Sequence, residues 1–339
     1  MLNSIDIVII IIFNSILIIL TTVCSRKKTK KKKSETLISN TQIDGRRDIA
    51  LQAIRKKCAG IVEEHRKKFK IKAKSGLSDA SDARSEVNRY SYVECYDKSR
   101  VILKNTKNGY IHANRIQGFD YIVTQGPMAK TIVDFWLMCI QEKVSTIVQL
   151  CQFTESGETQ CERYYPQTEG KMEKYGDFEV KYLKKKDHPI KGVIWAWLEI
   201  KTPNKTRQVD LIHVPWWSEK RIPDDPGPTM ELSKWVEKQK EDWQALAVCN
   251  SGEGRSVSFV AIMFTNYYTR SSVGVKDDMA IAIEQLRKDV PFAVKNEEDY
   301  LFLHACVVYS AMSEGMLGQN IAEPFLTEYK EYVRKNYRN

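Results

Sequence analysis

Apolar residues follow three different patterns along the chain. Residues 7–23 form an almost continuous apolar run, whereas residues 47–70 place apolar side chains three or four positions apart. From about residue 86, short β-branched runs that predict strands alternate with longer periodic stretches that predict helices. This mixture predicts an α/β or α+β domain built on a mixed sheet. The predicted strands are 100–103, 121–124, 146–150, 193–200, 207–214 and 245–248, and the predicted helices are 130–143, 229–244, 257–271, 276–288 and 297–313.

The run at residues 7–23, IVIIIIFNSILIILTTV, predicts one membrane-spanning helix, because about 20 apolar residues cross a bilayer core. A cleaved signal peptide would instead place basic residues before the run and small residues after it. Here Asp6 precedes the run, and a basic cluster at 26–33 follows it. The positive-inside rule therefore predicts a single-pass membrane protein whose remaining chain is cytoplasmic. Residues 26–33 are also expected to attract anionic lipid headgroups.

The net charge of +10 is concentrated near the N-terminus, which bears on both partners and domains. Residues 26–74 carry 18 basic and 5 acidic side chains, whereas residues 75–339 sum to −2. A nucleic-acid-binding domain would be expected to carry its own basic face, so no nucleic acid partner is expected. The predicted parts are a membrane anchor (1–25), a basic linker with a helix that docks on the domain (26–83), a globular domain (84–312) and a charged C-terminal tail (313–339).

The eight cysteines show neither CxxC spacing nor a Cys/His cluster of the kind that binds zinc. In a chain of 339 residues they are typical of reduced intracellular thiols that fill a core. No metal or cofactor is therefore expected. Cys249 is the exception, because its surroundings predict chemistry.

The segment 245–264, ALAVCNSGEGRSVSFVAIMF, predicts a strand, a glycine-containing loop and an apolar helix. Cys249 and Arg255 bracket the loop with five residues between them. Gly252 and Gly254 allow a tight turn whose N–H groups converge on one point, toward which the helix directs its positive end. This context, more than the spacing of the two residues, favours a phosphate-binding loop over a chance pairing.

The residue types in this loop predict nucleophilic chemistry on a phosphoryl group. Arg255 can hold two oxygens of an oxyanion in a bidentate fork. A cysteine at the same focus is expected to exist partly as the thiolate, which is the reactive nucleophile. Ser256 can donate a hydrogen bond to the sulfur of Cys249 and ease its departure.

The loop resembles the HCSAGxGRTG signature of the tyrosine-specific protein phosphatases. Other stretches resemble family motifs in the same order: 88–103 (NRYSYVECYDKSRVIL), 110–114 (YIHAN), 124–127 (TQGP), 134–136 (DFW), 161–166 (CERYYP) and 291–304 (PFAVKNEEDYLFLH). The similarity covers roughly residues 84–312. The resemblance implies a mixed, highly twisted β-sheet flanked by helices. It also implies that the protein acts on phosphotyrosine-containing proteins.

The resemblance also implies roles for individual residues. Cys249 would attack phosphorus and form a cysteinyl-phosphate, and Tyr90 would stack on the phenol ring of the substrate. The segment 217–223, WSEKRIP, occupies the place of the family's mobile acid loop, with Glu219 in the position of the general acid. The phosphate would be held by Arg255 and the backbone of Asn250, Ser251, Gly252, Glu253 and Gly254.

Several residues depart from the family pattern around the site. Glu219 replaces an Asp, and the extra methylene moves the acid by about 1 Å or more, a misplacement that can cost about a hundredfold in rate. Glu253 would repel a phosphate dianion unless it points to solvent or pairs with a basic residue. Lys295 stands where a Gln positions the hydrolytic water, and it could either bind phosphate as a cation or reach into solvent. Further departures are Tyr92, His112, Gln160, Val248, Asn250, Ser251, Val257 and Asp299.

Three functions remain open at the level of the sequence. The first is a membrane-anchored tyrosine phosphatase with reduced turnover, supported by Cys249, Arg255 and the carboxyl group of Glu219. The second is a catalytically inactive module that captures phosphotyrosine, supported by an intact phosphate cradle with altered hydrolytic residues. The third is an interaction scaffold that binds no phosphate, for which Glu253 is the main support.

Overall fold

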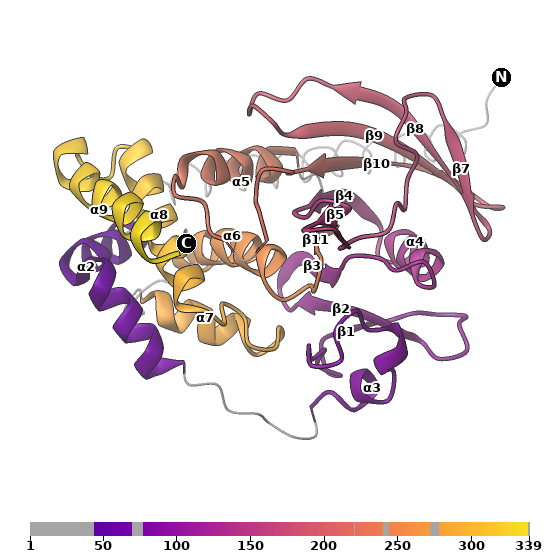
Figure 1. Ribbon diagram of the computed structural model, residues 1–339, viewed down its shortest axis with the longest axis horizontal. Coiled ribbons are helices and arrows are strands. Elements are labelled where there is room, and N and C mark those ends of the chain that lie inside the picture. Colours follow the sequence, from indigo (N-terminus) through magenta and orange to yellow (C-terminus); the bar gives the residue numbers. More distant parts are fainter. Residues whose placement is uncertain (1–43, 70–76, 220, 240–243, 272–277, 338–339) are drawn as a thin grey trace, which may run out of the picture. The chain divides into compact units, whose positions relative to one another are not determined.

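A mixed nine-stranded sheet lies at the centre of the computed structural model, which describes residues 44–69, 77–219, 221–239, 244–271 and 278–337 (Figure 1). The strand order is β1-β2-β3-β11-β4-β10-β9-β8-β7. A separate hairpin, β5-β6, follows β4. The strands are β1 (Arg100–Ile102), β2 (Tyr110–Ile116), β3 (Phe119–Gln125), β4 (Val144–Gln149), β5 (Thr154–Glu155), β6 (Glu158–Thr159), β7 (Met172–Tyr175), β8 (Phe178–Lys186), β9 (Ile194–Lys201), β10 (Thr206–His213) and β11 (Gln244–Cys249).

The middle of this sheet is parallel. β11 pairs in parallel with β3 on one side and with β4 on the other, and β4 pairs in parallel with β10. The sequence of β11, QALAVC, is buried at every position from Ala245 to Cys249, as expected for a strand covered on both faces. Because these four strands run the same way, their carboxyl ends meet at one edge of the sheet.

Helices cover both faces of the parallel strands. α6 contacts β11 and β3, and it also contacts α5, α7 and α8, whereas α4 packs on β4 from the opposite side (Figure 1). Asp278 begins α7 by accepting a hydrogen bond from the N–H group of Ala280, which caps the helix. The helices are α2 (Arg46–Lys68), α3 (Asp79–Asp82), the 3-10 helix η1 (Ser85–Val87), α4 (Ile132–Gln141), α5 (Gly227–Gln239), α6 (Arg255–Ser271), α7 (Met279–Leu286), α8 (Glu297–Ser313) and α9 (Gln319–Tyr337).

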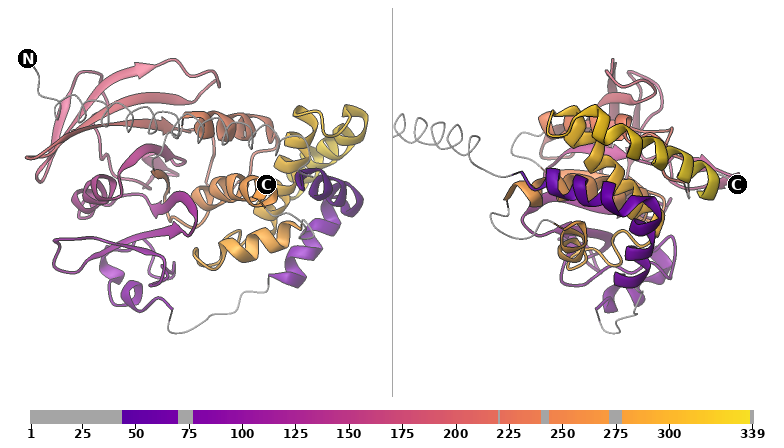
Figure 2. Two further views of the ribbon diagram at one scale, coloured as in Figure 1. Left: turned by 180° about the vertical axis from the view of Figure 1, so that it is seen from behind. Right: turned by 90° about the vertical axis from the view of Figure 1, so that its left-hand side faces the viewer.

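The helix expected in the linker packs directly on the domain. α2 contacts α8 and α9, and the three lie together in both views of Figure 2. Arg46 forms an ion pair with Glu314, and the Nε2 atom of His65 lies 3.0 Å from the carbonyl oxygen of Val294. The unit that contains the domain accordingly begins at Gly45.

The C-terminal segment differs from the charged tail expected over 313–339. It contains the helix α9, whose Phe325, Tyr329 and Val333 side chains are buried. The charges of this segment lie on the remaining faces of the helix, which is why a count of charged residues alone suggested a tail.

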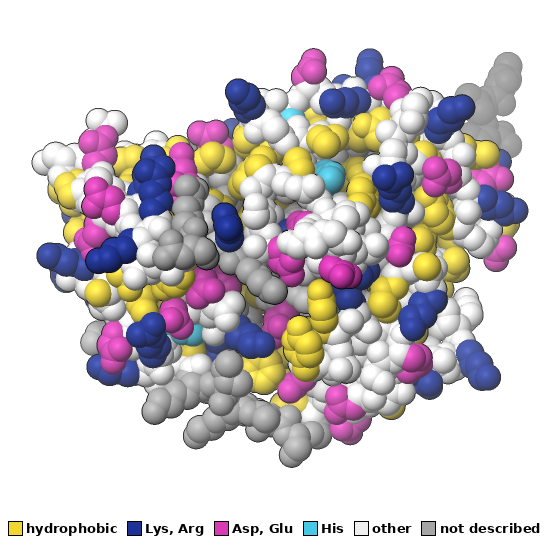
Figure 3. All heavy atoms as spheres, viewed as in Figure 1, with side chains coloured by type: hydrophobic (Ala, Val, Ile, Leu, Met, Phe, Trp, Pro, Cys, Tyr) yellow, Lys and Arg dark blue, Asp and Glu magenta, His cyan; other side chains and the backbone are white. Residues whose placement is uncertain are grey.

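On the face shown in Figure 3, acidic and basic side chains are interspersed, in line with the near-balanced charge of residues 75–339.

The predicted strands and helices all have counterparts in the structure, with shifts of a few residues at their ends. The strands β2, β5, β6, β7 and β8 were not predicted. The anchor predicted at 7–23 and the basic cluster at 26–33 lie outside the described residues. Within the described residues, no helix combines the length and the apolar character needed to cross a membrane.

Candidate active site

Four loops meet at the carboxyl edge of the parallel strands. β3 ends at Gln125, β4 leads into the hairpin that carries Glu155, β10 leads into the loop that carries Glu219, and β11 ends at Cys249. The registers place the ends of these strands at the same level, because Cys249 pairs with Gln125. Ligands of open α/β sheets characteristically bind at such an edge.

The loop after β11 turns sharply at Gly252. Its φ angle is +75°, and an added Cβ atom would lie 2.7 Å from the backbone nitrogen of Gln125. Both the conformation and the lack of space therefore require glycine at this position. Gly254 differs from the prediction, because an added Cβ atom there would meet nothing within 4 Å. Gly254 instead borders the cavity above the loop.

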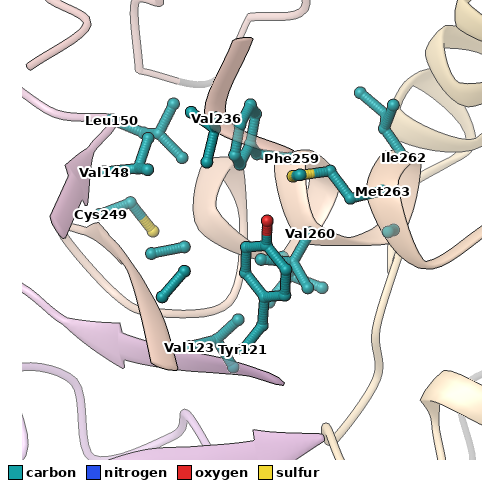
Figure 4. Close-up of a cluster of buried hydrophobic side chains, with 14 of the residues drawn as sticks. Tyr121, Val123, Val148, Leu150, Val236, Cys249, Phe259, Val260, Ile262 and Met263 are labelled. Carbon is teal, nitrogen blue, oxygen red and sulfur yellow. The ribbon is translucent and has the colours of Figure 1, made fainter. Parts of the chain in front are cut away.

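The sulfur of Cys249 faces the inside of this loop. Its Sγ atom accepts a hydrogen bond from the N–H group of Gly252 at 3.3 Å and lies 3.1 Å from Ser256 Oγ. The side chain is completely buried, at 0% exposure, and Figure 4 shows it at the end of β11 beside Val148 and Leu150. The thiol thus lies at the base of the loop, within reach of donors that would stabilise a thiolate.

Arg255 begins α6 and is held by two other loops. Its Nη1 and Nη2 atoms donate to the two carboxylate oxygens of Glu155 at 2.6 and 2.8 Å, and Nη1 also donates to the carbonyl oxygen of Trp217 at 2.9 Å. Burial is the largest single influence and lowers the pKa of Arg255, but the hydrogen bonds to Glu155 and the electrostatic effects of Cys249, Cys151 and Glu155 together raise it. The guanidinium is therefore a fixed positive charge at the cavity.

The donors that remain on Arg255 suit an oxyanion. A guanidinium has five N–H groups. Among the described residues, Glu155 and Trp217 take both N–H groups of Nη1 and one of Nη2. The Nε–H group and the second N–H group of Nη2 remain, and these two lie on one edge of the planar group. That edge has the geometry for two parallel hydrogen bonds to a phosphate.

Glu155 owes its position to a tight hairpin. Ser156 and Gly157 have φ angles of +53° and +82°, the left-handed values that a two-residue hairpin turn requires at both central positions. The turn folds β5 back on β6 and holds Glu155 against Arg255, with only 8% of the Glu155 side chain exposed. The prediction from sequence did not include Glu155. The Ser-Gly pair after a buried strand is the signal that could have indicated this hairpin.

Tyr90 forms one wall of a cavity of about 260 Å³ above the loop. Its loop is fixed to β3, because Arg89 donates its backbone N–H group to Gln125 Oε1 and its side chain binds the carbonyl oxygens of Gly126 and Pro127. The ring of Tyr92 contacts that of Tyr90 at a centroid distance of 5.5 Å. The loop that carries Tyr90 and Tyr92 is thus held in place by Arg89. The sequence analysis did not identify this role of Arg89.

Glu253 and Lys295 pair with each other at the edge of this cavity. Lys295 Nζ lies 3.2 Å from Glu253 Oε1, and the side chains are 34% and 15% exposed. The pairing supplies the basic partner without which Glu253 was expected to repel phosphate. The lysine is therefore paired with a carboxylate of the protein itself.

Asp299 adds a titratable carboxyl group near the cavity. Its Oδ1 atom accepts a hydrogen bond from Ser258 Oγ at 2.9 Å, and burial raises its pKa to about 6. The hydrogen bond from Ser258 acts in the opposite direction but is the weaker influence. The carboxyl group of Asp299 is therefore expected to lose its proton around pH 6, within a unit or so of neutral pH.

The acid position, Glu219, lies in the loop that follows β10. Trp217 closes this loop by donating from its indole nitrogen to the carbonyl oxygen of Arg221 at 2.9 Å, and its ring packs edge-on against Phe302 of α8. Glu219 Oε1 accepts a hydrogen bond from the side-chain nitrogen of Asn250 at 3.1 Å. The acid loop and the cysteine loop are thus in direct contact.

The structure brings the predicted site residues together. Those that line the cavity are Tyr90, Glu219, Asn250, Ser251, Glu253, Gly254, Arg255 and Lys295. Cys249, Gly252 and Ser256 form hydrogen-bonded contacts with one another in the same loop. Ser251 departs from its expected backbone role, since its Oγ atom also accepts a hydrogen bond from the N–H group of Glu253 at 3.2 Å.

Comparison with known proteins agrees with this geometry. The family model for the protein-tyrosine phosphatases matches residues 84–309. The chain is 34% identical over 229 residues to tyrosine-protein phosphatase non-receptor type 7 of Mus musculus, covering 64% of this chain and 62% of that protein. It is 30% identical over 239 residues to the tyrosine-protein phosphatase Lar-like protein of Caenorhabditis elegans, covering 68% of this chain and 11% of that protein.

The chain therefore belongs to the protein-tyrosine phosphatase family, and the resemblance noted from its motifs is confirmed. The matched region spans less than two thirds of the length of these relatives. Their number includes receptor-type proteins, such as receptor-type tyrosine-protein phosphatase eta of Gallus gallus, which is 28% identical over 291 residues covering 81% of this chain and 19% of that protein.

Proposed function

We propose that this protein hydrolyses phosphotyrosine in proteins through a cysteinyl-phosphate intermediate. The observation that carries the proposal is the arrangement of one loop, in which Cys249 Sγ accepts from Gly252 while Arg255 presents a free edge of N–H groups. Membership of the protein-tyrosine phosphatase family supports the same substrate class.

The first chemical step transfers the phosphoryl group to sulfur. The Cys249 thiolate attacks phosphorus, a bond forms between sulfur and phosphorus, and the bond to the tyrosine oxygen breaks. Glu219 donates a proton to that leaving oxygen. Arg255 stabilises the charge on the phosphoryl oxygens, and Tyr90 orients the ring of the substrate.

The second step returns the enzyme to its starting state. Water attacks phosphorus and gives up a proton to the Glu219 carboxylate, which restores the acid; the bond between sulfur and phosphorus breaks, inorganic phosphate is released, and the thiolate of Cys249 is the leaving group. Ser256 Oγ, 3.1 Å from the sulfur, stabilises this thiolate by donating a hydrogen bond. We propose that this step is slow, because Lys295 and Asp299 provide no side-chain amide to orient the water.

The N-terminal segment supplies a proposed location. Residues 7–23 would form a single membrane-spanning helix, and the basic cluster at 26–33 would place the phosphatase domain in the cytoplasm. The domain would then meet phosphotyrosine proteins close to the membrane surface.

A comparison of three forms of the full-length chain tests the proposed activity. Turnover of p-nitrophenyl phosphate and binding of a phosphotyrosine peptide are measured for the wild type, Cys249→Ser and Arg255→Met. We expect slow turnover that is abolished in Cys249→Ser, and a burst near one equivalent of phenol if the second step limits the rate. A wild-type protein that does not turn over p-nitrophenyl phosphate would refute hydrolysis.

A second candidate function is capture of phosphotyrosine without hydrolysis. The pairing of Lys295 with Glu253 favours this second function, because the pair leaves anion binding to Arg255 intact. Lys295 also takes the place of an amide that would orient the hydrolytic water. In that case the wild type binds the phosphopeptide without turning it over, and Arg255→Met loses the binding. A protein with neither property would be a scaffold.

A further inference from the structure

Asn250, which departs from the family pattern, contacts two other residues that also depart from it, Gln160 and Glu219. The Nδ2 atom of Asn250 donates to Gln160 Oε1 at 3.0 Å and to Glu219 Oε1 at 3.1 Å. The three residues lie on different loops: Asn250 follows β11, Gln160 follows β6 and Glu219 lies in the loop after β10. The contact therefore joins the acid loop to two fixed parts of the site.

The amide group of Asn250 is held rigidly. Asn250 is only 8% exposed, and each of the two N–H groups of its side chain has an acceptor. The nitrogen of this amide faces Glu219, because it donates the hydrogen bond that Glu219 Oε1 accepts.

Gln160 is in turn fixed from two sides. Its residue is 5% exposed, and its backbone N–H group donates to the carbonyl oxygen of Phe153 at 2.8 Å. The hydroxyl group of Tyr90 also donates to Gln160 Oε1, at 3.4 Å. Burial and the nearby Glu219 carboxylate raise the pKa of Tyr90, which keeps this hydroxyl group protonated.

The hydrogen bond from Asn250 restrains the carboxyl group of Glu219, which the longer side chain would otherwise leave misplaced. A glutamate has one more rotatable bond than an aspartate, and its carboxyl group reaches further into the cavity. Asn250 takes one carboxyl oxygen, Oε1, whereas Oε2 has no hydrogen-bond partner among the described residues. Oε2 is thus the oxygen that can carry a proton for transfer.

We infer that Asn250, held by Gln160, is a positioning residue that fixes the carboxyl group of Glu219 for proton transfer to the departing phenolate. The inference rests on the proposed phosphatase activity. In this arrangement the family's shorter acid and small loop residue have been replaced together by a longer acid and an amide that restrains it.

The test compares two substrates that differ in their need for a proton. The tyrosine phenol, with a pKa of about 10, is a poor leaving group, whereas the more acidic phenol of difluoromethylumbelliferyl phosphate leaves readily without protonation. For Asn250→Ser in the full-length protein, we expect kcat/KM on a phosphotyrosine peptide to fall about tenfold to a hundredfold. The loss on the umbelliferyl substrate should be several-fold smaller than the loss on the peptide, because the side chain of Asn250 acts through the acid and the backbone of residue 250 is kept.

Two further variants show whether the effect passes through Glu219. In a Glu219→Gln background, Asn250→Ser should cause no further loss, because the acid is already absent. In a Glu219→Asp background, Asn250→Ser should cause little further loss, because the shorter acid does not need the restraint. Gln160→Leu, which removes the acceptor that holds Asn250, should reproduce part of the loss without altering the cysteine loop.

The outcomes separate this inference from the proposed function. Asn336→Ser, an exposed asparagine on α9, serves as the matched control and should leave both substrates unaffected. Equal losses on the two substrates, or additive losses with Glu219→Gln, would overturn the positioning role while leaving the phosphatase activity in place. A wild type inactive on both substrates would instead overturn the proposed function and, with it, the role of Glu219 as an acid.

Discussion

Lys295 Nζ lies 3.2 Å from Glu253 Oε1, so that a cation on the loop before α8 neutralises an anion in the proposed phosphate-binding loop. Each residue taken alone is unfavourable for catalysis, since one adds negative charge beside a dianion and the other replaces an amide. As a pair they leave the local charge balanced. Their effects on anion binding should therefore depend on each other.

Removing only the cation should weaken anion binding. In Lys295→Gln the Glu253 carboxylate stays beside the bound dianion, and we expect the inhibition constant for tungstate to rise about threefold to tenfold, allowing for the partial exposure of both groups. In the double variant Glu253→Gln/Lys295→Gln the constant should return close to the wild-type value. Equal inhibition constants in the wild type and in Lys295→Gln would show that the pair does not act on the anion.

The ion pair between Glu155 and Arg255 should be important for stability. Both side chains are at most 8% exposed, so that removing the carboxylate leaves a buried charge without its partner. We expect Glu155→Ala to lower the free energy of unfolding by about 3–5 kcal/mol, and tungstate to restore much of that loss by binding to Arg255. Glu158→Ala, in the same hairpin but exposed, is the control and should have little effect in urea unfolding.

The two glycines of the loop should respond differently to the same substitution. Gly252→Ala places a Cβ atom 2.7 Å from the backbone of Gln125 at a positive φ angle, and should destabilise the protein by several kcal/mol. Gly254→Ala has open space and should fold with nearly wild-type stability. Thermal unfolding of both variants measures this difference, and similar losses in the two would contradict the steric argument.

The raised pKa of Asp299 predicts a pH dependence of stability. Its pKa is about 6 in the folded protein against an ordinary value of 3.8, so the folded state binds the proton more tightly than the unfolded state. The resulting stabilisation is complete below pH 3.8 and is lost as the pH rises through about 6. The variant Asp299→Asn cannot ionise and lacks this loss. Its stability relative to the wild type should therefore increase by up to about 3 kcal/mol between pH 4 and pH 7.5.

Urea unfolding of the wild type and Asp299→Asn at matched pH values checks this prediction, because the titration of all other groups cancels in the difference. A difference in the free energy of unfolding that does not change with pH would mean that Asp299 titrates normally.

The elements with regular apolar spacing could be predicted from the sequence. β11 and α6 were expected because a buried strand and an apolar helix each have a local signature, and Gly252 marks the turn between them. β8, with the sequence FEVKYLKKK, was missed because its lysines hide the alternation of buried residues at Phe178, Val180 and Tyr182. α9 was missed because its buried residues are few among many charges.

The loop at the centre of the proposed site could be predicted from the sequence, because Cys249, Gly252, Arg255 and Ser256 lie within one short segment whose geometry is local. The distant side chains that surround this loop could be identified only from the folded structure. Glu155 meets Arg255, and Gln160 and Glu219 meet Asn250, because parallel strands far apart in sequence deliver their loops to one edge of the sheet. Hydrogen bonds and ion pairs act over a few ångströms in space, so the spacing of residues along the chain does not reveal them.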